Sequence, residues 1–152
     1  MIWLFVVVGC VLLQLLLTAI LRHLKCLPKS FGKERVKLQI RENRGFLMGK
    51  CADRPKAVQS VTLLCAVFAT ICLLPFLFAS NQSHAAKLAC TLLLAGCWGN
   101  VTDRLVRGCV TDYLSFPKAF GKLKRIVFNL ADLLLVFGAL FAIVALFFRK
   151  DA

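Results

Sequence analysis

The chain has 152 residues, of which 60% are hydrophobic, a mean hydropathy of +0.80 and a formal net charge of +13. Ordinary soluble domains are roughly 45–50% apolar, so this composition excludes a typical soluble protein and indicates an integral membrane protein. The positive charge does not point to a nucleic-acid partner, because the basic segments lack interleaved aromatic residues and a recognisable binding motif.

Four apolar runs are long enough to cross a bilayer, which takes about 20 helical residues. They cover residues 2–21, 57–80, 85–106 and 126–148. The first run lacks a cleavage site of small residues, so we expect a retained anchor instead of a removable signal peptide. The predicted fold class is therefore an all-α integral membrane protein with four transmembrane helices, forming a single domain over residues 1–152.

The two long loops of this arrangement share one face of the membrane, because an even number of crossings separates them. They cover residues 22–56 and 105–125 and hold most of the lysines and arginines, which we expect to bind anionic lipid headgroups. Within the first loop, "VKLQIREN" at residues 36–43 alternates apolar and polar residues, as a strand does. We predict a small β-element there, lying on the membrane surface.

Asp132 is the strongest functional candidate, because an apolar tract with no other charge follows it. A lone carboxylate costs roughly 2.5–3.5 kcal/mol at mid-bilayer and less near the interface, and intramembrane acids usually serve a function. Asp112 lies twenty residues upstream, just past the third run, so both carboxylates can meet at one mouth of the bundle. Two adjacent carboxylates share a proton, and such a pair can activate a water and hydrogen-bond a scissile carbonyl.

Buried aspartates also pair with arginines, and the residues alone leave this alternative open for Asp112 and Asp132, with Arg104 or Arg107 as partners. Asp103 fits such a supporting role better, together with Asn100 and Arg107 on one helix face. Neither cysteines nor histidines lie at metal-ligand spacing, so we predict no metal and no cofactor.

Three polar segments follow one another in a specific order: GNVTDR from residue 99, GCVTDY from residue 108 and FNLAD from residue 128. Together they resemble the signature of lipoprotein signal peptidase, also called signal peptidase II. That signature reads Gly-Asn-x-x-Asp-Arg, then Gly-x-Val-x-Asp-Phe/Tyr, then Phe-Asn-x-Ala-Asp. The helix count and the long first loop also resemble this family, so the likeness covers essentially the whole chain.

The resemblance implies an aspartic endopeptidase of the bacterial cytoplasmic membrane, which removes signal peptides from diacylglyceryl-modified prolipoproteins and works without a cofactor. It makes Asp112 and Asp132 the catalytic pair. The residues that it assigns to substrate binding or to support of the site are Asn43, Gly45, Asn100, Asp103, Arg104 and Asn129. We expect a monomer.

The chain departs from the family pattern in two segments. The first helix of the family ends in Asp-Gln-x-Ser/Thr-Lys, whereas here only Gln14 matches and leucines, Leu13 and Leu17, replace the acid and the lysine. In the first loop the family carries Asn-x-Gly-Ala-Ala-Phe. This chain keeps the asparagine and the glycine and then reads Phe46, Leu47 and Met48.

The loop charges and the family resemblance predict opposite orientations of the chain in the membrane. Counting lysines and arginines places both long loops in the cytoplasm, but the active site of the family faces outward. Three matched polar motifs carry more weight than a statistical charge bias, so we expect the active site on the outer face.

Two other functions fit parts of the sequence. A non-catalytic membrane protein on the same scaffold, binding lipidated peptides, would explain the altered first helix and first loop. A transporter using Asp132 as a proton carrier would want polar residues spread through the bilayer, and the second and fourth runs have few.

Overall fold

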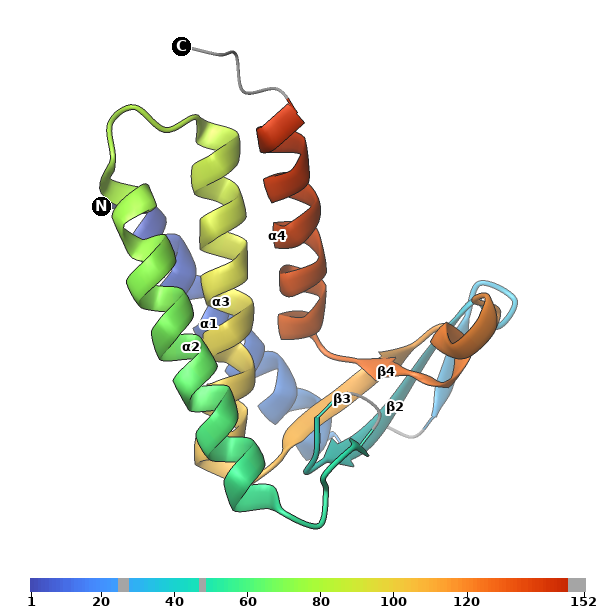
Figure 1. Cartoon of the computed structure of the whole chain (residues 1–152). Coiled ribbons are helices and arrows are strands. Elements are labelled where there is room, and N and C mark those ends of the chain that lie inside the picture. Colours follow the sequence, from blue (N-terminus) through green and yellow to red (C-terminus); the bar gives the residue numbers. More distant parts are fainter. Residues whose placement is uncertain (25–27, 47–48, 148–152) are drawn as a thin grey trace.

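The computed structural model describes residues 1–24, 28–46 and 49–147. Leu47 and Met48 of the first loop and Phe148, the last residue of the fourth predicted helix, lie outside this part. The four helices are α1 (Ile2–His23), α2 (Pro55–Phe78), α3 (His84–Arg107) and α4 (Leu130–Phe147) (Figure 1). Three of them begin and end within two residues of the predicted bounds.

The fourth helix begins four residues later than predicted, because the segment before it is not helical. Val127 and Phe128 form the short strand β4, and Asn129 separates this strand from α4. The apolar residues Val127 and Phe128 belong to the sheet, and composition alone does not distinguish a buried strand from the start of a helix.

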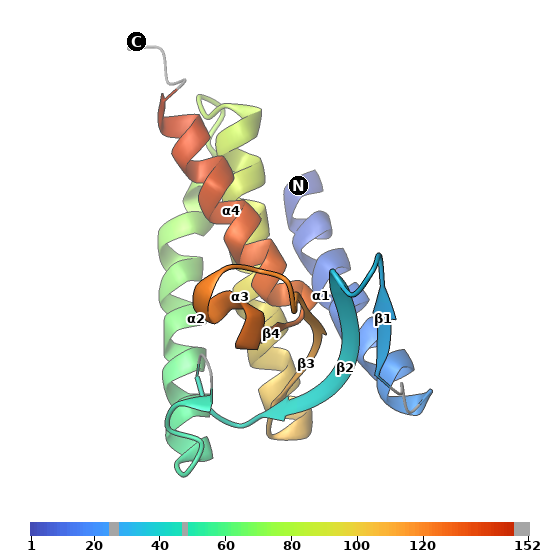
Figure 2. The same cartoon turned by 90° about the vertical axis from the view of Figure 1, so that its right-hand side faces the viewer.

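A small antiparallel sheet lies at one end of the helices, with the strand order β1-β2-β3-β4 (Figure 2). Its strands are β1 (Lys29–Phe31), β2 (Val36–Asn43), β3 (Val110–Ser115) and β4 (Val127–Phe128). The strand predicted at residues 36–43 is confirmed. The sheet extends beyond the predicted β-element, because β3 and β4 come from the second long loop. Nearly all of β3 is buried, so it lacks the polar alternation that marked β2.

Within the described ranges, three helices are long and apolar enough to cross a membrane, namely α1, α2 and α4. Helix α3 has 24 residues but is more polar. It packs against α1, α2 and α4, so protein covers much of its surface. A helix in this position tolerates polar side chains that a lipid-facing helix would not.

Helices α3 and α4 approach each other closely because glycines line their contact. A Cβ atom at Gly96 would lie 2.6 Å from Leu135 Cγ and 2.7 Å from the carbonyl oxygen of Ala131, and one at Gly99 would lie 2.9 Å from Ala131 Cβ. Small residues at such a contact let two backbones pack tightly. The contact places the polar end of α3 directly beside the start of α4.

The turn between α2 and α3 and the start of α1 lie toward one end of the bundle, and the sheet lies at the other (Figure 1). Helix α3 ends at Gly108, which has a left-handed φ of 72° and so turns the chain sharply into β3. The polar end of α3, the sheet and the start of α4 therefore meet on one side.

Gly96→Ala should destabilise the protein, because the added methyl group meets backbone atoms of α4 that cannot move aside. We expect the free energy of unfolding to fall by about 1–3 kcal/mol. Gly9→Ala on α1 is the control, since a Cβ atom there meets nothing within 4 Å. Thermal unfolding of both variants in one detergent measures the difference. Equal melting temperatures would contradict the close packing of α3 and α4.

Candidate active site

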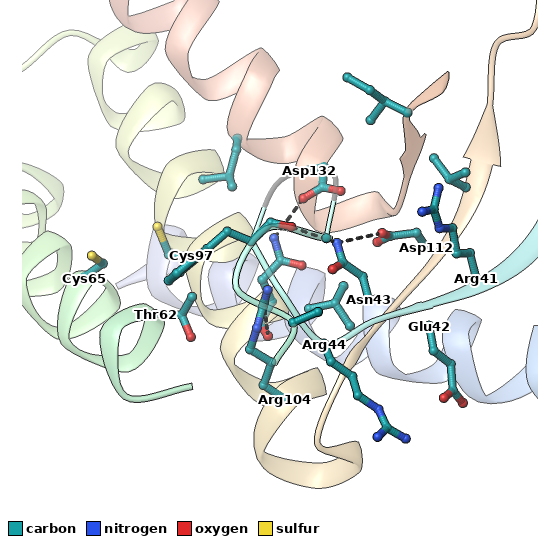
Figure 3. A pocket seen from close by; sticks show the side chains of 18 of the residues that line it. Arg41, Glu42, Asn43, Arg44, Thr62, Cys65, Cys97, Arg104, Asp112 and Asp132 are labelled. Carbon is teal, nitrogen blue, oxygen red and sulfur yellow. Dashed lines mark hydrogen bonds between the residues drawn. The ribbon is translucent and has the colours of Figure 1, made fainter. Parts of the chain in front are cut away.

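A cavity of about 870 Å³ opens where the sheet meets α2, α3 and α4 (Figure 3). Asp112 of β3 and Asp132 of α4 both line it. Asn43, at the end of β2, and Asn100 and Arg104 of α3 line it as well. The structure therefore brings together polar residues from four elements that span residues 43 to 132 of the chain.

Asp112 lies on β3 with 5% of its surface exposed. Its Oδ1 accepts a hydrogen bond from Asn129 Nδ2 at 2.9 Å, and its Oδ2 accepts one from Asn43 Nδ2 at 3.3 Å. Burial raises the pKa of this carboxyl group to about 6, and the nearby charge of Asp132 adds to the rise. The two amide donors and Arg104 oppose it, because they stabilise the charged form.

Asp132 sits in the first turn of α4 and shares a reciprocal pair of bonds with Asn129. The backbone N–H of Asn129 donates to Asp132 Oδ2 at 3.2 Å, and the backbone N–H of Asp132 donates to Asn129 Oδ1 at 3.0 Å. This pattern is a capping box, which satisfies N–H groups at the start of a helix. The positive end of the helix dipole also favours a carboxylate at this position.

Asn129 connects the two aspartates and is completely buried. Besides its bond to Asp112, its Nδ2 donates to Asn100 Oδ1 at 3.1 Å. Asn100 Nδ2 in turn donates to Asp132 Oδ1 at 2.9 Å. Two asparagines thus hold the two carboxyl groups at the same cavity.

Of the three aspartates near the site, Asp103 pairs with an arginine, and Asp112 and Asp132 do not within the described residues. Asp103 is fully buried, forms an ion pair with Arg107 and accepts the backbone N–H of Thr111 at 3.2 Å. In residues 1–24, 28–46 and 49–147, neither Asp112 nor Asp132 forms an ion pair. The network predicted on α3 also differs, because Asn100 bonds to Asp132 and Asn129 instead of Asp103.

Arg104 holds the first loop above the cavity. Its guanidinium donates to the carbonyl oxygen of Gly45 at 2.8 Å and to that of Asn100 at 3.3 Å. A Cβ atom at Gly45 would lie 2.3 Å from the carbonyl oxygen of Lys50, so the turn after β2 has room only for glycine there. Asn43 accepts the Gly45 N–H at 3.1 Å, and this bond ties the turn to Asp112. Gly45 does not line the cavity, so its contacts are those of a structural residue.

Several residues that support the site were not predicted. Gln14 of α1 accepts a hydrogen bond from the Tyr113 hydroxyl at 3.3 Å, and that hydroxyl accepts the N–H of Leu130 at 2.9 Å. Arg22 donates to Thr111 at 3.0 Å and to Glu42 at 2.8 Å. A glutamine inside an apolar run is a signal that could have identified the first contact. The partners of Arg22 depend on the sheet and were not recognisable.

A sequence model described as "Signal peptidase (SPase) II" matches residues 5–148. The chain belongs to the signal peptidase II family. A lipoprotein signal peptidase of Clostridioides difficile (strain 630) is 32% identical over 112 residues, which is 73% of this chain and 70% of that protein. The lipoprotein signal peptidase of Moorella thermoacetica is 34% identical over 100 residues, and there the chain spans 59% of the relative's length.

Solved structures share the fold. A bacterial membrane enzyme structure obtained by the in meso method at 2.3 Å resolution superposes with a TM-score of 0.79 and 21% identity, covering 99% of this chain and 93% of that one. A second, at 1.9 Å resolution, gives a TM-score of 0.74 and 22% identity. The chain is therefore a multi-pass membrane protein of the signal peptidase II family.

The carboxyl group of Asp112 should titrate near pH 6, and removing a donor to its charged form should raise this pKa further. Asn129→Ala should raise it more than Asn43→Ala does, because the Asn129 bond is the shorter one. Infrared difference spectroscopy of the carboxyl C=O stretch measures the titration, and the band that Asp112→Asn removes assigns it. Asn81→Ala in the turn after α2 is the control. An Asp112 pKa near the ordinary value of about 3.9 would contradict the buried geometry.

Proposed function

We propose that this protein is an aspartic endopeptidase that removes the signal peptide from diacylglyceryl-modified prolipoproteins, with Asp112 and Asp132 as the catalytic pair. The protease activity follows from membership of the signal peptidase II family and from the relatives named lipoprotein signal peptidase. The observation that carries the aspartic mechanism is that both carboxyl groups line one cavity and bond to the same buried asparagine.

The pair would act by direct attack of water, without a covalent intermediate. One ionised carboxylate accepts a proton from the water while the protonated partner donates a hydrogen bond to the scissile carbonyl oxygen. The side-chain amides of Asn43, Asn100 and Asn129 would hold the two carboxyl groups in place by donating hydrogen bonds to them. Each carboxyl group would keep a lone pair free for the water or the substrate. Arg104 would support the reaction indirectly, because it holds the turn that carries Asn43.

The cavity wall suits a substrate that combines a peptide with apolar chains. Its inner side is formed by Ala66 of α2, Cys97 of α3 and Leu135 of α4, so it opens between helices that face lipid. The signal helix and the diacylglyceryl chains would enter from the membrane along these helices. Asn43 and Phe46, which line the opposite side, would cover the scissile bond.

The membrane placement that we propose has four crossings in a single domain, with α3 as the fourth. At 1.5 Å rise per residue its 24 residues reach about 36 Å, which is enough to span a bilayer. We further propose that a monomer acts in the bacterial cytoplasmic membrane with the sheet and the active site on the outer face, where the basic first loop contacts anionic headgroups.

The altered first helix favours the non-catalytic alternative, since leucines replace the acid and the lysine of the family. Other contacts join α1 to the site in this chain, however. Gln14 bonds to Tyr113 beside Asp112, and Arg22 bonds to Thr111 on the other side of it. A protein that only binds lipidated peptides would gain nothing from a buried and a half-buried carboxyl group that form no ion pair in the described part of the chain.

Asp112→Asn and Asp132→Asn should each reduce cleavage of a lipidated prolipoprotein by roughly 10²- to 10⁴-fold or more, because each removes one half of the acid–base pair. Asp53→Asn is the matched control, since Asp53 is exposed and pairs only with Arg54. Purified variants in one detergent are compared by the appearance of the cleaved signal peptide. Retained cleavage in either active-site variant would contradict the dyad. A wild-type protein that binds the prolipoprotein without cutting it would support the alternative.

The efficiency kcat/KM should fall as the pH rises above about 6, because the pair works with one shared proton and Asp112 loses its proton in that range. Asn129→Ala should move this decline to higher pH, since it raises the pKa of Asp112. A pH series of initial rates measures both. A kcat/KM that rises through neutral pH would show that the reaction needs both carboxyl groups ionised.

A further inference from the structure

A second hollow, of about 300 Å³, lies on the sheet side of the bundle, where α2 begins and α3 ends. Its lining consists of Arg44, Pro55, Lys56, Gln59, Arg107 and Gly108, and we call it the cationic hollow. One water occupies roughly 30 Å³ in the liquid, so the hollow has room for a phosphodiester group. The hollow would give a specific site to the contact between the basic first loop and anionic headgroups proposed above.

The charges around the cationic hollow are positive and mostly uncompensated. Arg44 and Lys56 are exposed and form no ion pair within the described ranges. Arg107 is bonded to Asp103, but the carboxylate of Asp103 is completely buried and does not line the hollow. An anion in the hollow would therefore meet three cationic side chains from three segments.

The start of α2 adds backbone donors to these cations. Its N-cap residue, Arg54, makes no side-chain capping bond, and no acidic residue lies in its first turn. Most helices satisfy the free N–H groups of the first turn with such a cap, and the helix dipole makes this end partly positive. Gln59, one turn further, lines the hollow and offers an amide donor. Because Pro55 has no N–H group, the backbone donors that the first turn of α2 offers to an external anion are those of Lys56 and Ala57.

The surface of α2 below the hollow suits acyl chains. At 100° per residue, Leu63 and Val67 lie within about 20° of the direction of Lys56. Leu63 is half-buried and Val67 is 41% exposed. A molecule with a phosphate in the hollow and two hydrocarbon chains would cover these side chains along α2.

We propose that the cationic hollow binds the phosphate group of an anionic phospholipid whose acyl chains lie along α2. The charge complementarity of the hollow and the apolar stripe on the same side of α2 select this ligand over a soluble anion. Arg44 lines both the hollow and the active-site cavity, and its guanidinium points away from Asp112 and Asp132 (Figure 3). The bound lipid would thus sit beside the cavity. The proposal does not depend on the peptidase activity.

Native mass spectrometry of the full chain in detergent tests the proposal, with dioleoyl phosphatidylglycerol and dioleoyl phosphatidylcholine as probes. We expect phosphatidylglycerol to bind at least tenfold more tightly than phosphatidylcholine. The choline ammonium group of phosphatidylcholine would be repelled by the cationic side chains that line the hollow. Arg44→Gln combined with Lys56→Gln should remove this preference. The control, Lys118→Gln combined with Lys122→Gln, removes the same charge from the second basic loop, outside the hollow, and should weaken the preference less than the test variant does.

Three outcomes would overturn the proposal. Equal loss of binding in the test and control variants would mean a general charge effect. Equal binding of both lipids to the wild type would remove the selectivity for an anion. Displacement of phosphatidylglycerol by millimolar inorganic phosphate would identify a site for free phosphate. The melting temperature of each variant is measured alongside, and Lys56→Gln alone, at an exposed position, should give a partial loss of the preference in a folded protein.

Discussion

The candidate active site depends on the hydrogen bonds of one buried side chain, that of Asn129. Its amide nitrogen reaches Asp112 on β3 and Asn100 on α3, while its oxygen and its backbone N–H join it to Asp132 at the start of α4. The bonds that cap a helix are thus the same bonds that orient a carboxyl group. Sheet, α3 and α4 must all be in place for this arrangement to form, so fold and site are specified together.

The cost of burying polar groups explains where the other residues lie. Helix α3 carries Asn100, Asp103 and Arg104, and each of them bonds within the protein. Because α1, α2 and α4 surround α3, these groups need not face lipid. Lipid-facing helices remain almost free of charge, and the polar side chains gather at the one end where the sheet can supply partners.

The sequence predicted the four helices, the strand at residues 36–43 and the position of Asp112 and Asp132 at one end of the bundle, because hydropathy, alternation and a lone acid in an apolar run are local signals. It could not predict that the second long loop completes the sheet, since β3 is buried and lacks alternation. The sequence also predicted the wrong partner for Asn100, which bonds to Asp132 and Asn129 and not to Asp103. On an isolated helix the nearest partner is three or four residues away, but the packing of α4 against α3 places Asp132 and Asn129 within reach of Asn100. Gly45 matches the glycine of the family motif, but its contacts are within the turn after β2 and it does not line the cavity.

The proposed mechanism requires Asp112 and Asp132 to lie close enough to hold one water and one proton between them. A crystal structure at high resolution, with ordered solvent, measures the separation of their nearest carboxyl oxygens. Two hydrogen bonds of about 2.8 Å each allow a separation of up to about 6 Å, and we expect a water within hydrogen-bonding distance of both. Carboxyl groups further apart than that, or an Asp132 side chain turned toward lipid, would contradict the account.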